Sequence, residues 1–151
     1  MKYEIVKLSE KKMIGVEART NNMAPDMPAV IGGLWDKLFR GGIYNSIKNK
    51  SNNKAIGAYS EYASDASGDY TVTIGVEVND VNDIPAGTVE KTIPGGKYAK
   101  FIVKGDQVKA VQEFWQKLWK MDLDRSYKCD FEEYQDDNME DATVYIYISL
   151  K

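Results

Sequence analysis

The stretch Leu34-Trp35-Asp36-Lys37-Leu38-Phe39 decides the fold, because it recurs 80 positions later as Phe114-Trp115-Gln116-Lys117-Leu118-Trp119. Both copies follow an apolar-Trp-x-Lys-Leu-aromatic pattern, and their apolar positions share one face of a helix. Three shorter matches keep the same order along the chain: residues 12–14 match 97–99, residues 59–62 match 131–134, and residues 70–74 match 142–146. Four ordered matches, whose spacing drifts only as loop lengths would, indicate an internal duplication.

The two units, at about residues 2–78 and 88–150, contain the same predicted elements. The first has strands at about 3–8, 13–19, 56–62 and 69–78, and a helix that Asp26 caps and Gly41-Gly42 ends. The second has strands at about 88–93, 98–103, 127–134 and 143–150, and a helix that Asp106 caps. Residues 79–87 form the connector. This order predicts an α+β fold: a duplicated βαββ unit with pseudo-twofold symmetry, an antiparallel sheet of about eight strands and two main helices.

The length of 151 residues fits one domain, which we expect to span residues 1–151. Where the two halves of a duplicated domain meet, a cleft is expected, and clefts of this kind are common ligand sites.

The composition excludes several classes of function. Hydrophobic residues make up 43% and charged residues 28%, which is typical of a folded globular chain. The chain has no histidine, so it lacks the commonest transition-metal ligand and the usual catalytic base. It also lacks the glycine-rich loops that bind nucleotides, and we expect no metal and no cofactor.

Partners and location follow from charge and hydropathy. A net charge of −3, without a basic stripe or a helix-turn-helix, predicts no direct binding to nucleic acid. No signal peptide and no apolar run of roughly 18 residues is present, so we expect a cytoplasmic protein that does not enter membranes. The single cysteine, Cys129, is expected to be a small core or strand residue.

One strand carries a candidate binding residue. In Phe131-Glu132-Glu133-Tyr134, alternation places Glu132 and Tyr134 on one face of the sheet and the other two residues on the opposite face. If the Glu132 face points inward, a carboxylate lies among aromatic rings and needs a cation, hydrogen bonds or a raised pKa. A cationic aromatic ligand would meet that need. The alternative is that Glu132 is exposed to solvent and that the many aromatic residues only pack the core.

Two other features have open interpretations. Gly32-Gly33 within the first helix costs about 1 kcal/mol per residue relative to alanine. Close approach by a strand or a ligand would explain it, or the helix begins after these residues. The acidic run at residues 136–141 is expected to be a solvated turn.

The chain resembles the GyrI-like small-molecule-binding domain, which is also the effector-binding domain of multidrug-responsive regulators of the MerR and AraC types. The stretches that carry the resemblance are the two tryptophan helices, residues 68–78, the turn at 93–98, Phe131-Glu132-Glu133-Tyr134, and Tyr145-Ile146-Tyr147-Ile148. The resemblance covers nearly the whole chain.

The resemblance implies an aromatic pocket at the pseudo-twofold, with a buried glutamate that meets lipophilic cations. The family's Phe-Glu-x-Tyr motif corresponds to Glu132 and Tyr134, and the tyrosine of the last strand corresponds to Tyr147. The remaining residues implied to line the pocket are aromatic: Trp35, Phe39, Tyr59, Tyr98 and Trp115.

We therefore expect a protein that binds lipophilic, cationic aromatic compounds, and we favour binding over catalysis. Some members of the family hydrolyse cyclopropane-bearing natural products, so the resemblance also implies an alternative in which Glu132 is the catalytic residue. A third possibility is a protein inhibitor, because the founding member acts on DNA gyrase. A separate regulator could be a protein partner.

Overall fold

The computed structural model describes residues 1–151 and contains eight strands and three helices. The strands are β1 (Glu4–Leu8), β2 (Lys11–Thr20), β3 (Lys50–Ser60), β4 (Tyr70–Val78), β5 (Val89–Ile93), β6 (Gly96–Gly105), β7 (Cys129–Tyr134) and β8 (Ala142–Ser149). The helices are α1 (Met27–Phe39), α2 (Ile43–Ser46) and α3 (Gln107–Leu118).

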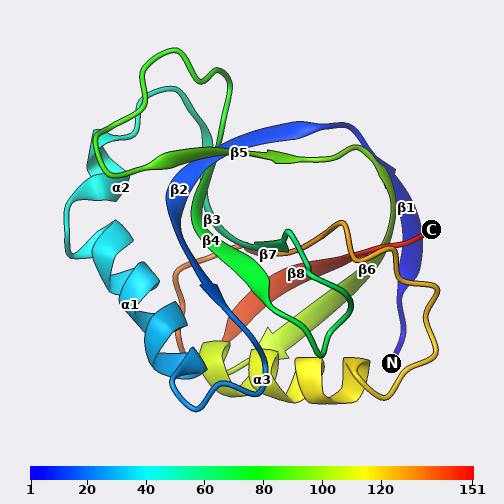
Figure 1. The fold of residues 1–151 in the computed structure, drawn as a ribbon. Helices are drawn as coiled ribbons and strands as arrows, with labels where there is room; N and C mark the ends of the chain where they lie inside the picture. The colour runs from blue at the N-terminus through cyan, green and yellow to red at the C-terminus, as the bar shows by residue number, and fades with distance from the viewer.

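All eight strands form one antiparallel sheet in the order β1-β6-β8-β7-β3-β4-β2-β5. This order is symmetric about its centre, which lies between β7 and β3. Each strand has its counterpart from the other unit at the same position on the opposite side of the centre. The first strand of each unit pairs with the other unit, β1 with β6 and β5 with β2. Figure 1 shows the sheet strongly curled, with α1 and α3 on its outer side. The predicted α+β architecture is confirmed.

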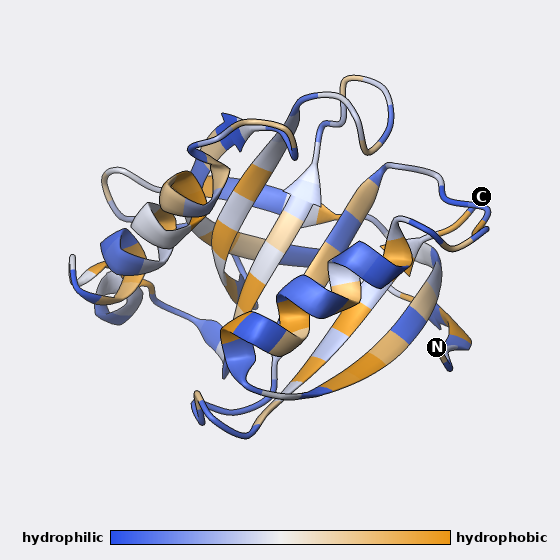
Figure 2. Cartoon of the chain, turned by 90° about the horizontal axis from the view of Figure 1, so that it is seen from below, coloured by the Kyte–Doolittle hydropathy of each residue, from blue (hydrophilic) through white to orange (hydrophobic).

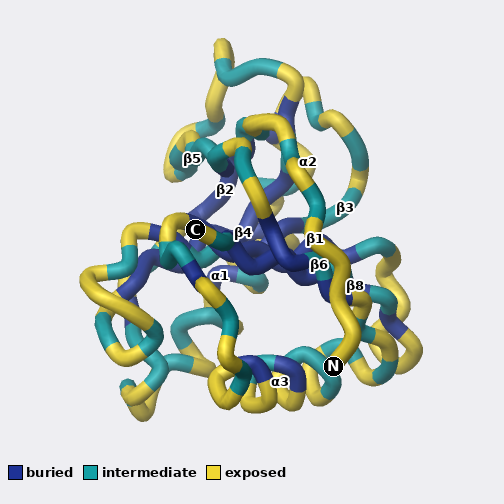
Figure 3. Tube along the Cα trace, turned by 90° about the vertical axis from the view of Figure 1, so that its right-hand side faces the viewer, coloured by how far each residue is buried: buried dark blue, intermediate teal, exposed yellow.

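The helices pack on the sheet through the residues that the repeat predicts. Leu34 and Leu38 of α1 are buried against strands of the first unit, and Phe114 and Leu118 of α3 against strands of the second. Hydrophilic residues lie on the outer side of α3 (Figure 2). Buried residues concentrate in the strands, whereas the connecting loops are exposed (Figure 3). No helix has the length and apolar character needed to cross a bilayer.

A third buried cluster fills the inner side of the curled sheet. It contains Met13, Tyr98, Phe131 and Tyr147, together with smaller apolar residues. Cys129 also belongs to it, as predicted for a core residue, and burial raises the pKa of its thiol to about 12. The two faces of the sheet therefore have separate interiors.

The predicted helices are present, with one difference at a cap. The side chain of Asp106 accepts a hydrogen bond from the backbone N–H of Lys109 at 2.9 Å. Asp26 precedes α1, but its side chain makes no such bond. Since Pro28 has no backbone N–H, one of the free donors that a cap would satisfy is already missing from the first turn. The short helix α2 was not predicted.

Strand pairing corrects the alignment of the repeats in one place. Tyr59 of β3 pairs with Val72, and Tyr134 of β7 pairs with Val144, so Tyr134 is the counterpart of Tyr59. At the same shift of 75 positions, the counterpart of Glu132 is Gly57, and not Ser60 as the sequence match suggests. Gly57 and Glu132 also face each other across the β3–β7 ladder. The pseudo-twofold axis therefore passes between these two residues.

Close packing of the backbone explains two glycines of the sheet but not the two glycines of α1. Gly15 and Gly75 pair directly across β2 and β4, and an added Cβ on Gly75 would overlap the carbonyl oxygen of Ile14. Such close approach of two backbones is a known use of strand glycines. A Cβ on Gly32 or Gly33 would meet nothing within 4 Å, although both lie within α1. Neither a late helix start nor a close strand therefore explains these two.

Gly75→Ala is expected to lower the free energy of unfolding by about 1–3 kcal/mol, because the backbone of β2 must move to admit a methyl group. Gly33→Ala, on the exposed side of α1, is the matched control and should raise it by about 0.4–1 kcal/mol. Urea unfolding of both variants measures these changes. A Gly75→Ala variant as stable as the wild type would contradict the close approach.

Candidate functional site

A cleft of about 1180 Å³ lies between α1 and α3, above the central strands of the sheet. Both helices, the central strands and the loop after β7 contribute to its walls. Among its lining residues are six of the eight that the sequence predicts: Trp35, Phe39, Tyr59, Trp115, Glu132 and Tyr134.

Glu132 lies at the floor of this cleft and is only 2% exposed. Its Oε2 accepts hydrogen bonds from Trp115 Nε1 at 2.7 Å and from Tyr59 Oη at 3.0 Å. Its Oε1 accepts one from Tyr134 Oη at 2.7 Å. The donors come from α3, β3 and β7, so one carboxylate joins both halves of the domain.

Gly57 provides the space that this carboxylate occupies. A Cβ at Gly57 would lie 3.1 Å from Glu132 Oε1 and 3.4 Å from Cδ1 of Ile74, the residue beside it on β4. A side chain at Gly57 would therefore require the carboxylate to move by a few tenths of an ångström.

Burial raises the pKa of Glu132, although its three hydrogen bonds act in the opposite direction. All three donors are neutral, and Glu132 forms no ion pair. The pKa values of the Tyr59 and Tyr134 hydroxyls are raised well above their usual range by burial and then by the charge of Glu132. Both hydroxyls therefore keep their protons and remain donors.

The aromatic walls repeat the pseudo-twofold symmetry. Trp35 packs edge-on against Tyr134, with ring centroids 5.1 Å apart, and Trp115 packs against Tyr59 at 5.3 Å. Phe39 stacks beside Trp35 at 6.0 Å and is 46% exposed at the mouth. These rings give the cleft a large apolar surface around a single buried carboxylate.

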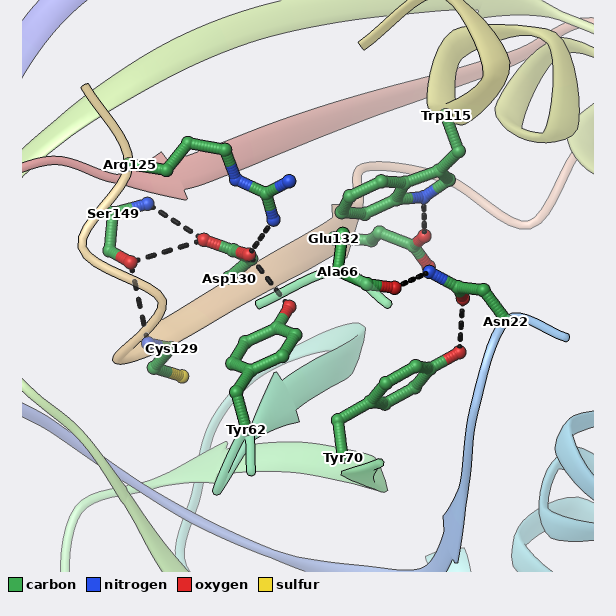
Figure 4. Close-up of polar contacts among 10 residues, drawn as sticks. All are labelled: Asn22, Tyr62, Ala66, Tyr70, Trp115, Arg125, Cys129, Asp130, Glu132 and Ser149. Carbon is green, nitrogen blue, oxygen red and sulfur yellow. Dashed lines mark hydrogen bonds and ion pairs between the residues drawn. The ribbon is translucent and has the colours of Figure 1, made fainter. Parts of the chain in front are cut away.

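A second buried acid lies two residues before Glu132. Asp130 Oδ2 accepts hydrogen bonds from Arg125 Nη2 and Tyr62 Oη, both at 2.7 Å. Its Oδ1 accepts from the backbone N–H of Ser149 at 2.8 Å and from the Ser149 hydroxyl at 3.1 Å. Figure 4 shows this cluster beside Glu132. Unlike Glu132, Asp130 has a buried cation as its partner.

Tyr98 and Tyr147, both predicted to line the pocket, lie outside the cleft. Tyr147 pairs directly with Phe131, whose side chain points away from the Glu132 face, and their rings stack at 4.6 Å. Tyr98 packs against the same two rings on the inner side of the sheet. Strand alternation is the physical reason: residues opposite Phe131 cannot share the face of its neighbour Glu132. The prediction for these two residues is corrected accordingly.

Several residues at the site were not identified from the sequence: Gly57, Tyr62, Tyr70, Arg125 and Asp130. Asp130 could have been found, since it shares a strand face with Glu132 by alternation. Arg125 lies in the loop before β7, where no periodic pattern predicts the direction of a side chain.

Known proteins resemble this chain over nearly its whole length. The chain matches the Cass2 family, described as integron-associated effector binding protein, over residues 4–150. It is 31% identical to "Putative transcriptional regulator protein YobU" of Bacillus subtilis (strain 168), over 97% of this chain and 96% of that protein.

Solved structures share the fold. The integron cassette protein VCH_CASS2 from the mobile metagenome of Vibrio cholerae has a TM-score of 0.81 at 25% identity, covering 99% of this chain and 95% of that one. SAV2435, solved with bound tetraphenylphosphonium, has a TM-score of 0.80 at 21% identity, covering 100% of this chain and 94% of that one. The GyrI-like resemblance expected from the sequence is confirmed, and the chain belongs to the integron-associated effector-binding protein family.

Proposed function

We propose that the cleft binds lipophilic, monovalent, aromatic cations, and that Glu132 is the residue that recognises their charge. The observation that carries this proposal is a carboxylate, 2% exposed, with three neutral hydrogen-bond donors and no cation of its own. A buried ionised carboxylate without a counter-charge is costly, and a bound cation would remove much of that cost.

The preference for a single positive charge follows from the neighbouring acid. The charge of Asp130 is already matched by Arg125 through a 2.7 Å ion pair. Among the buried acids at the floor of the cleft, this leaves one uncompensated negative charge, that of Glu132. A monovalent cation neutralises that charge, whereas a divalent one would leave an excess positive charge in an apolar site.

The preference for aromatic cations follows from the walls. Trp35, Tyr59, Trp115 and Tyr134 line the cleft together with Glu132, and their rings pack edge-on in two pairs. Each cation–π contact contributes roughly 0.5–2 kcal/mol, and apolar ligand surface gains further from burial. The tetraphenylphosphonium bound to SAV2435 is a ligand of this chemical class.

Glu132→Gln should weaken tetraphenylphosphonium binding by about 1–3 kcal/mol, or roughly 5- to 150-fold, because the amide keeps the size of the side chain but removes its charge. Quenching of tryptophan fluorescence measures the dissociation constant. Tyr147→Phe is the matched control, since Tyr147 lies on the other face of the sheet, and its affinity should equal that of the wild type. Equal affinity in Glu132→Gln would reject charge recognition by this residue.

The affinity for tetraphenylphosphonium should rise as pH rises through the raised pKa of Glu132, because only the ionised carboxylate attracts a cation that does not itself titrate. Dissociation constants measured from about pH 4 to about pH 8 test this. Asp36, Asp136 and Asp137 also line the cleft, are exposed, and remain in Glu132→Gln. Any pH dependence that survives in that variant comes from groups other than Glu132, and an unchanged profile would reject Glu132 as the titrating group.

The raised pKa of Glu132 also makes stability depend on pH, in the direction opposite to that of ligand affinity. Since folding raises the pKa of Glu132, the fold is favoured when this group is protonated, and that contribution is lost as pH rises through the raised value. Glu132→Gln should therefore be at least as stable as the wild type at neutral pH. Urea unfolding checks this and shows that any loss of binding does not come from misfolding.

Hydrolysis by the same residue is a second candidate, favoured by one observation. Burial raises the pKa of Glu132, and a general base works best when its pKa lies near the working pH. Incubation with a cyclopropane-bearing compound, followed by mass spectrometry, would then show a product heavier by one water in the wild type but not in Glu132→Gln. Intact compound after long incubation with the wild type would leave binding as the function.

A further inference from the structure

Arg125 lines the same cleft, and the binding of a simple cation does not use it. Its side chain is 7% exposed, and in Figure 4 its guanidinium points toward Trp115 and Glu132. A guanidinium has five N–H donors, and the protein uses one nitrogen, Nη2, in its bond to Asp130. Nε is buried without a partner, whereas Nη1 makes no hydrogen bond within the protein and is not fully buried.

The guanidinium is fixed in place by its surroundings. Asp130 holds Nη2, and all four hydrogen bonds to that carboxylate come from Arg125, Tyr62 and Ser149. The Tyr127 ring lies 4.3 Å from the guanidinium carbon and provides a cation–π contact. A donor held this firmly loses little freedom when it binds a ligand, which favours recognition.

We infer that Arg125 forms a second subsite in the cleft, where Nη1 donates to a neutral carbonyl oxygen of the bound cation. The inference rests on the proposed function and narrows its ligand class to lipophilic monocations that carry an ester, amide or ketone group. Glu132 recognises the charge, and Arg125 selects and orients the ligand by its carbonyl.

The charges at the floor of the cleft favour a neutral carbonyl over a carboxylate as the ligand group that binds Arg125. Arg125 and Asp130 already neutralise each other, and a monocation neutralises Glu132. A carboxylate on the ligand would add one unmatched negative charge to a largely apolar site beside Glu132, which is unfavourable. A neutral carbonyl accepts the hydrogen bond without that charge. The subsite should therefore favour esters and reject the acids from which they derive.

The experiment uses three kinds of triphenylphosphonium probe that differ only in the fourth substituent: an alkyl chain, the same chain ending in a methyl ester, and the same chain ending in a carboxylate. The chain is varied in length, so that the carbonyl can reach Arg125 in at least one member. At the best length, the wild-type protein should bind the ester about five- to tenfold more tightly than the alkyl probe. It should bind the carboxylate more weakly than either.

The readout within each variant is the ratio of the alkyl to the ester dissociation constant, so a general change in the cleft cancels. The ratio should fall to about one in the double variant Arg125→Met/Asp130→Asn, which removes the ion pair without leaving a buried charge. Arg125→Lys is the second variant. Lysine has one side-chain nitrogen, which pairs with Asp130 and leaves no donor at the position of Nη1, so the ratio should fall in this variant as well. Arg40→Met is the control: Arg40 is the other arginine that lines the cleft, it is exposed, and the ratio should persist without it.

The outcomes distinguish this inference from the function on which it rests. If the wild type binds none of the phosphonium probes, the proposed function fails. If it binds the alkyl probe and the ratio is one at every chain length, or if the ratio persists in the double variant, only the carbonyl subsite is rejected. Urea unfolding of each variant confirms that the compared proteins are folded.

Discussion

The buried carboxylate of Glu132 is the constraint on which the rest of the site depends. Without hydrogen bonds, a charge at this depth would cost several kcal/mol. Trp115 on α3, Tyr59 on β3 and Tyr134 on β7 each donate to it, so the position of α3 and the pairing of the central strands both matter for its stability. The same arrangement fixes three rings of the aromatic wall, because their polar atoms are held at the carboxylate.

The position of Glu132 on the pseudo-twofold axis explains why the duplication is unequal there. Trp35 and Trp115 are counterparts, as are Tyr59 and Tyr134, so both halves build similar walls. At the axis, the counterpart of Glu132 is the residue directly opposite it. A second glutamate would place two carboxylates in one buried space, where like charges repel. Gly57 avoids this repulsion and also leaves the volume that the carboxylate needs.

Much of this architecture was predictable from the sequence, because it depends on local periodicity. The helix spacing identified the buried faces of α1 and α3, and strand alternation placed Glu132 and Tyr134 on one face. The counterpart of Glu132 was not predictable, because it depends on register. Val72 pairs with a residue thirteen positions earlier and Val144 with one ten positions earlier, and sequence matching cannot detect that difference. The family resemblance implies that Tyr98 and Tyr147 line the pocket, but both lie on the opposite face of the sheet, and the resemblance contains no information on which face a residue occupies.

Asp130 and Glu132, the two buried acids on the cleft-facing side of β7, differ in their surroundings rather than in their chemistry. Asp130 accepts four hydrogen bonds and has a buried cation, so its oxygens have little to offer a ligand. Glu132 lacks a cation, and Arg125, which compensates Asp130, keeps donors that the protein does not use. The cleft therefore contains two groups of opposite charge whose interactions are incomplete: Glu132 lacks a counter-charge, and Arg125 has N–H donors that the protein does not use. A ligand that satisfies both must be polar at two points and lipophilic elsewhere, which is a stricter requirement than positive charge alone.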